Sequence, residues 1–128
     1  MMQEKEIHSL VESYIRAYNK FEIDTMVSLF SSDCVFESVS NSGNSMKCVG
    51  PDKLRETALH GASFFSQRQQ SIVHWIFGQD KAVVELQYNA VLAKDLPGGL
   101  KAGSEMKLQG VSVFEFADGK IKRLADYS

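Results

Sequence analysis

The most informative stretch of the chain begins with LVESYIRAYN, residues 10–19, and continues to FSSDCVFE, residues 30–37. Apolar residues recur at helical spacing in its first part, which predicts an amphipathic helix with one buried face. Tyr14 and Tyr18 lie one turn apart on that face. A buried phenol adds apolar bulk but also carries a hydroxyl that needs a hydrogen-bonding partner. The pair therefore indicates either a helix laid over a cavity or two core aromatics whose hydroxyls reach the backbone or water.

The spacing of apolar residues changes from helical to alternating near residue 67. Before that point we expect a second helix capped by Asp24 and ended by Asp33, a strand over 34–39, and a third helix starting at Gly50-Pro51-Asp52. After it we expect four strands joined by hairpins. Their expected ranges are 70–77, 82–93, 105–116 and 121–127. This order predicts an α+β fold, with helices from the N-terminal half packed on a curved antiparallel sheet.

The composition fits one globular domain spanning residues 1–128. Apolar residues make up 44% of the chain, and its net charge is −2. This charge, without a basic cluster, gives no reason to expect nucleic-acid binding, and no apolar run is long enough to cross a membrane. The charged N-terminus lacks the apolar core of a signal peptide, so a cytoplasmic location is expected. The two cysteines and three histidines lack ligand spacing, so we expect reduced thiols and no metal site.

Alternation along the strands assigns the two faces of the sheet. The even positions of 82–93 and 105–116 are mostly apolar, which places them, Tyr88 and Ser112 included, against the helices. In the last strand, Asp126 shares a face with Leu124. Two interpretations stay open: Asp126 faces a wet cavity with a hydrogen-bonding partner, or a bulge or frayed end leaves it in solvent.

By the same parity, several apolar residues fall on the opposite face: Trp75, Phe77, Val83, Val111 and Val113. A face in contact with water does not normally carry such a cluster, which favours a homodimer that packs sheet against sheet. Scattered apolar surface residues are the alternative.

In order and spacing, these motifs resemble the nuclear transport factor 2-like superfamily. The resemblance is carried by residues 14–19 and 29–36, by Gly50-Pro51-Asp52, and by the hairpin turns at 78–82 and 118–121. The chain looks most like the SnoaL-like and ketosteroid isomerase-like branch. The resemblance implies a cone-shaped, cystatin-like fold, a homodimer, and an apolar pocket between helices and sheet. It also implies a small apolar or ring-containing ligand and no cofactor.

The residues of the isomerase are only partly present here. Tyr14 matches its hydrogen-bonding tyrosine, but serines stand at the positions of its base and of its protonated aspartic acid, Ser38 and Ser112. Ketosteroid isomerase activity is therefore not expected. Asp126 lies where related cyclases and hydrolases often carry a pocket carboxylate. It is the expected base, with Tyr14 polarising an oxygen and His74 either shuttling protons or serving only a structural role.

The residues of the predicted pocket come from the first helix and from every predicted strand. Its expected ligand-binding residues are Tyr18, Phe36, Ser38, Tyr88 and Ser112, beside the catalytic candidates Asp126, Tyr14 and His74. Two functions stay open. One is a cofactor-free isomerase, cyclase, dehydratase or hydrolase, and the other is a non-catalytic binding or dimerisation module with a vestigial pocket.

Overall fold

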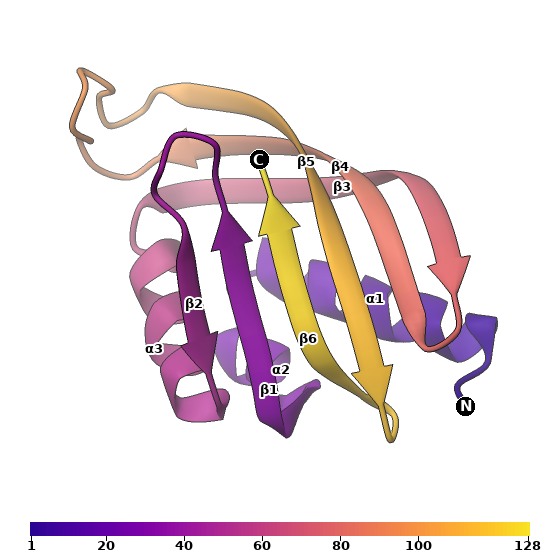
Figure 1. The fold of residues 1–128 in the computed structure, drawn as a ribbon. Coiled ribbons are helices and arrows are strands. Elements are labelled where there is room, and N and C mark those ends of the chain that lie inside the picture. The colour runs from indigo at the N-terminus through magenta and orange to yellow at the C-terminus, as the bar shows by residue number, and fades with distance from the viewer.

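A computed structural model describes all residues from Met1 to Ser128. It contains three helices and a six-stranded sheet, and the N-terminal helix lies beneath the sheet (Figure 1). The helices are α1 (Glu4–Asn19), α2 (Ile23–Ser28) and α3 (Pro51–Ala62). The strands are β1 (Phe30–Val39), β2 (Met46–Val49), β3 (Phe65–Gly78), β4 (Lys81–Leu92), β5 (Glu105–Ala117) and β6 (Lys120–Tyr127).

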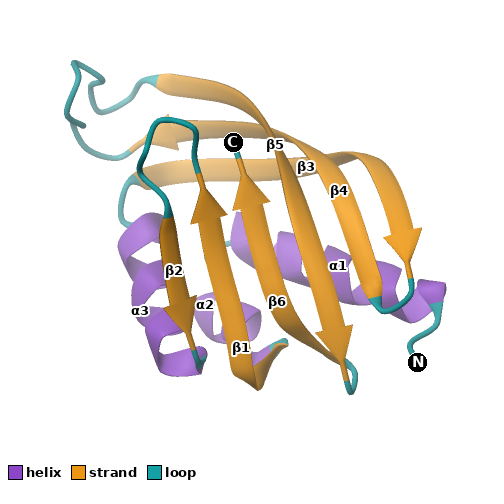
Figure 2. Cartoon of the chain, viewed as in Figure 1, coloured by secondary structure: helices purple, strands orange, loops and turns teal.

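The strands lie in the order β2-β1-β6-β5-β4-β3. Every neighbouring pair is antiparallel except β1 and β6, which run parallel. The long strands β3, β4 and β5 bend strongly, so the sheet forms a half-open cone and all three helices lie on its concave side (Figure 2). The predicted α+β architecture is confirmed, with one parallel pairing inside a mostly antiparallel sheet.

Alternating strand residues and the stripe of α1 together form one core of 18 buried residues. Ile7 and Val11 of α1 are almost completely buried, as are Phe114 of β5 and Leu124 of β6. The helix packs on the sheet because its apolar residues recur every three or four positions and so form one continuous stripe. No helix is long and apolar enough to cross a membrane.

Several element boundaries differ from those expected. Helix α2 ends at Ser28, so β1 begins at Phe30 rather than at residue 34, and β3 begins at Phe65 rather than at residue 70. The sequence between Ser66 and Gln70 is polar, so it carries no apolar alternation to mark a strand. Strand β2 was not predicted; it is a four-residue edge strand whose side chains are mostly exposed.

Two irregularities in register correct the predicted faces. In β3, Ile72 pairs with Leu86 but His74 pairs with Glu85, so Val73 is an extra residue. One extra residue reverses the parity of everything that follows. Trp75 and Phe77 therefore lie on the helix side, where the Trp75 ring stacks on His8 with centroids 4.3 Å apart. Their predicted place on the outer face is wrong.

The second irregularity lies between β5 and β6. Phe116 pairs with Ile121 whereas Glu115 pairs with Arg123, so Lys122 is an extra residue without a partner on β5. Ile121 thereby joins the core, although alternation counted back from Leu124 would place it on the outer face. Beyond this bulge the alternation continues undisturbed, and it carries Leu124 and then Asp126 to the helix side.

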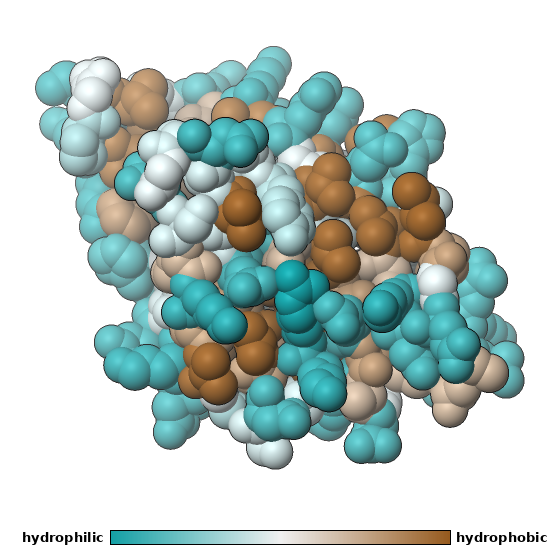
Figure 3. Space-filling view, viewed as in Figure 1, coloured by the Kyte–Doolittle hydropathy of each residue, from teal (hydrophilic) through white to brown (hydrophobic).

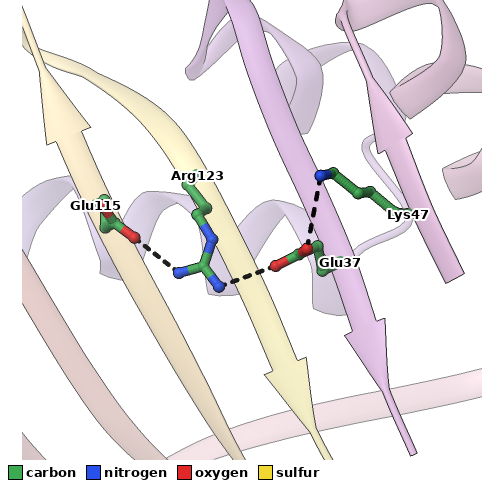
Figure 4. A network of polar contacts seen from close by, with 4 residues as sticks. All are labelled: Glu37, Lys47, Glu115 and Arg123. Atoms are coloured by element: carbon green, nitrogen blue, oxygen red, sulfur yellow. Dashed lines mark hydrogen bonds and ion pairs between the residues drawn. The ribbon is translucent and has the colours of Figure 1, made fainter. Parts of the chain in front are cut away.

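The outer face of the sheet is divided between a polar and an apolar part. Arg123 donates hydrogen bonds to Glu115 at 2.7 Å and to Glu37 at 2.8 Å, and Lys47 lies 4.0 Å from Glu37 (Figure 4). Towards β3 and β4 the surface becomes apolar (Figure 3). Residues of this apolar part include Ile76, Val83, Val111 and Val113.

Candidate functional site

A cavity of about 200 Å³ lies between the helices and the concave face of the sheet. Most of its wall is apolar. The larger apolar side chains are Met26, Phe36, Met46, Leu54 and Phe65. The polar groups that could act on a ligand are Tyr14, Tyr18, Ser38, Arg68 and Asp126. An apolar hollow with a few convergent polar groups is typical of a small-molecule site.

Asp126 projects from β6 into this cavity. It pairs across the sheet with Ser38 of β1 on one side and with Ser112 of β5 on the other, so all three share the concave face. Ser112 Oγ donates a hydrogen bond of 2.6 Å to Asp126 Oδ1. The carboxyl forms no ion pair within 4.0 Å. Between the two open interpretations, the structure therefore places Asp126 in the cavity.

The electrostatic setting of Asp126 suits proton transfer. Burial disfavours the charged form and raises the pKa of the carboxyl from 3.8 to about 6, although the hydrogen bond from Ser112 acts in the opposite direction. A group that titrates near neutrality can both accept and return a proton at physiological pH. This combination of position and pKa makes Asp126 the candidate base.

Tyr14 of α1 lines the same cavity and is 6% exposed. Its ring is held edge-on by Phe30 and Phe114, at centroid distances of 5.7 and 5.8 Å. Burial, and then the negative charge of Asp126, raise the pKa of the phenol well above its ordinary value. Tyr14 therefore remains protonated, and its hydroxyl can donate a hydrogen bond to a ligand.

Tyr18 lines the cavity one turn further along α1, and its hydroxyl lies 2.9 Å from the hydroxyl of Tyr88 on β4. Burial raises the pKa of both phenols, so the contact joins two neutral hydroxyls. Tyr88 itself is not part of the wall. It supports Tyr18 from behind, much as Ser112, only 3% exposed, supports Asp126.

Of the other predicted site residues, Phe36 and Ser38 line the cavity but His74 does not. The extra residue Val73 turns His74 to the outer face, opposite Glu85. There His74 borders a separate hollow of about 470 Å³. The expected partnership between His74 and Asp126 is therefore wrong, because the sheet lies between them.

Arg68 of β3 is a cavity residue that sequence reasoning missed. It pairs with Ala90, which places it on the concave face, and it is 6% exposed. Its guanidinium group lies over the rings of Tyr18 and Phe21, at 3.7 and 4.4 Å from their centroids. The signal that could have found it is register: continuing the β3–β4 hairpin pairing past the apolar positions brings Arg68 to the inward face.

The comparisons with known proteins agree with the fold described above. The model of the SnoaL-like domain family matches residues 11–124. No curated protein sequence matches the chain. Among solved structures, a polyketide cyclase candidate from Xanthomonas campestris pv. campestris superposes with a TM-score of 0.83 at 20% identity, covering 97% of this chain and 90% of that one.

Two further solved structures show the same fold at similarly low sequence identity. An LEH-like epoxide hydrolase of M. tuberculosis has a TM-score of 0.76 at 17% identity, covering 96% of this chain and 82% of that one. A protein of ketosteroid isomerase-like fold from Catenulispora acidiphila, solved in complex with trimethylamine, has a TM-score of 0.78 at 13% identity, with coverages of 93% and 84%. At these identities the likeness is one of fold.

Proposed function

The chain belongs to the SnoaL-like domain family, and we propose that its cavity binds a small, largely apolar ring compound and acts on it by acid–base catalysis. Asp126 is the proposed base and Tyr14 the proposed hydrogen-bond donor. The observation that carries this proposal is a cavity carboxyl, unpaired by any cation, whose pKa lies near 6. Perturbed carboxyls of this kind concentrate at catalytic sites, since burying one has a cost in stability.

In the proposed mechanism, the Asp126 carboxylate removes a proton from the ligand or from an attacking water molecule. Charge then develops on a ligand oxygen, to which Tyr14 donates a hydrogen bond. The protonated carboxyl afterwards returns its proton to the product. Ser112 keeps the Asp126 carboxyl oriented throughout, because its hydrogen bond to Oδ1 fixes one of the two oxygens.

The candidate reactions are isomerisation, cyclisation, dehydration and hydrolysis. Distant structural relatives carry names of cyclases, hydroxylases and epoxide hydrolases, which fit a carbonyl, epoxide or hydroxylated ring as substrate. Ligand sites for drug-sized molecules commonly enclose about 300–1,000 Å³. A cavity of about 200 Å³ therefore favours a molecule with one ring over a polycyclic one. Serines at 38 and 112 do not supply the acidic groups of a ketosteroid isomerase.

A binding screen tests the proposal. Single-ring ketones, epoxides and alcohols are added to the protein labelled with ¹⁵N and ¹³C-methyl groups, and hits are then assayed for turnover. We expect hits to perturb the methyl signals of Met26 and Leu54 and to be converted by the wild type. Conversion should fall about 100-fold or more in Asp126→Asn and about tenfold or more in Tyr14→Phe. Binding without conversion would favour a non-catalytic binding module. Absence of binding would contradict the proposed function and favour a dimerisation module with a vestigial pocket.

We also propose that two copies pair through the apolar part of the outer face, which includes Val83, Val111 and Val113. Ile76, 61% exposed, extends this patch. It takes the place predicted for Trp75 and Phe77, which the bulge in β3 turns inward. Light scattering at micromolar concentration should give twice the monomer mass for the wild type and one monomer for Val111→Lys. The edge variant Val49→Lys should remain dimeric. A monomeric wild type would contradict this pairing.

A further inference from the structure

Arg68 carries the one unsatisfied guanidinium nitrogen in the wall of the cavity. Its Nε donates a 2.8 Å hydrogen bond to the carbonyl oxygen of Tyr18, but its Nη2 is buried and has no hydrogen-bond partner. No carboxylate lies within 4.0 Å of the guanidinium group to form an ion pair. A side chain that is 94% buried thus retains an unused donor beside the cavity.

Burying a positive charge without a negative partner has a large desolvation cost. The rings of Tyr18 and Phe21 offset part of this cost through cation–π contact. The end of α1 offsets a further part, because carbonyl groups at a helix C-terminus attract cations. None of these contacts is a hydrogen bond to Nη2, so this donor of the guanidinium group remains unsatisfied.

We propose that the ligand of this cavity carries a carboxylate, which Arg68 binds while the reacting part of the ligand lies against Asp126. The planar guanidinium group matches the geometry of a carboxylate, with which it forms paired, charge-assisted hydrogen bonds. Arg68 and Asp126 are the only cation and the only carboxyl in the cavity wall. Arg68 would bind the carboxylate of a single-ring acid and Asp126 would contact its reacting part, so the two contacts together would fix the orientation of the ligand. This inference rests on the proposed function, since it specifies the ligand class of the same cavity.

A purely structural role for Arg68 would consist of holding the end of α1 against β3. Such a role explains the hydrogen bond to Tyr18 and the stacking on Phe21. It does not lead to any preference between an acid and a neutral molecule of the same shape. Selectivity for a carboxylate is therefore the property that separates the two roles.

The experiment compares matched probes by NMR titration at neutral pH: benzoate against benzamide, and phenylacetate against phenylacetamide. Hydrogen bonds to charged groups predict that each carboxylate binds the wild type about 10- to 100-fold more tightly than its amide. Arg68→Gln should lose this preference and keep amide binding. Arg55→Gln, which removes an arginine on the outside of α3, should keep the preference.

A second variant keeps the test independent of whether Arg68→Gln folds. Asp126→Asn removes the only negative charge of the wall, so it should tighten the binding of each carboxylate more than the binding of its amide. Amides that bind as well as carboxylates would overturn the carboxylate inference and leave the proposed function standing. If neither class bound at millimolar concentrations, both the inference and the proposed function would be overturned.

Discussion

Replacing Asp126 with asparagine should stabilise the protein, and the gain should depend on pH. Asparagine has nearly the same shape as aspartate, and its Oδ1 can still accept the hydrogen bond from Ser112 Oγ. The substitution therefore removes a titratable group from the cavity and little else. A buried carboxylate without a cation partner lowers the stability of the folded state, so its removal should raise the free energy of unfolding.

The sign and size of this effect follow from the pKa of Asp126. Burial raises this pKa from 3.8 to about 6, so between these values the folded state binds more protons than the unfolded state. The contribution of this group to the free energy of unfolding is largest below pH 3.8, and it is lost as the pH rises towards 6. At about 1.36 kcal/mol per pH unit, the loss reaches about 3 kcal/mol. We expect about 1–3 kcal/mol, because the carboxyl remains open to the cavity.

The assay is urea unfolding of the wild type and Asp126→Asn at several pH values from 4 to 8. The variant should be more stable by about 1–3 kcal/mol above pH 7, and the difference should shrink towards zero at pH 4. Asp118→Asn is the control, since Asp118 lies in an exposed turn whose left-handed backbone asparagine also tolerates. A gain for Asp126→Asn that is equal at all pH values, or a loss above pH 7, would refute the reasoning.

Three further predictions concern the same cavity. Ser112→Ala removes the hydrogen bond that lowers the pKa of Asp126, so carboxyl ¹³C titration should give a midpoint above 6; an unchanged midpoint would contradict this. Gly61→Leu projects into open space at the cavity wall, so it should abolish benzamide binding and preserve or raise the thermal midpoint, because glycine is a weak helix former. Tyr18→Phe and Tyr88→Phe should each lower the unfolding free energy by about 1 kcal/mol. The double variant should lose less than the sum, because both changes break one contact, whereas full additivity would show that the hydroxyls do not interact.

The fold could be predicted from the sequence because its main elements carry strong periodicity. The stripe through Val11 and Tyr14 fixes the buried face of α1. Counting alternate residues from Leu124 correctly carries Asp126 to the concave face, since no bulge lies between them. Because the stretch before Gln70 is polar, alternation does not predict the first residues of β3, and Arg68 is among them.

The errors in the sequence interpretation arise from single extra residues. Val73 reverses the parity of β3, which moves Trp75 to the helix side and His74 to the outer face. Lys122 does the same at the start of β6. Alternation alone cannot locate such bulges, because each leaves a locally regular pattern on both sides. The pairing of neighbouring strands is needed to detect them.

The central claim is that Asp126 is a cavity carboxyl that titrates near neutrality and contacts the ligand. Its side-chain ¹³C resonance can be titrated directly in the wild-type protein, first alone and then with saturating benzamide. We predict a midpoint of about 6 in the free protein and a different midpoint with the ligand bound. A midpoint near 3.8 that benzamide leaves unchanged would contradict the account.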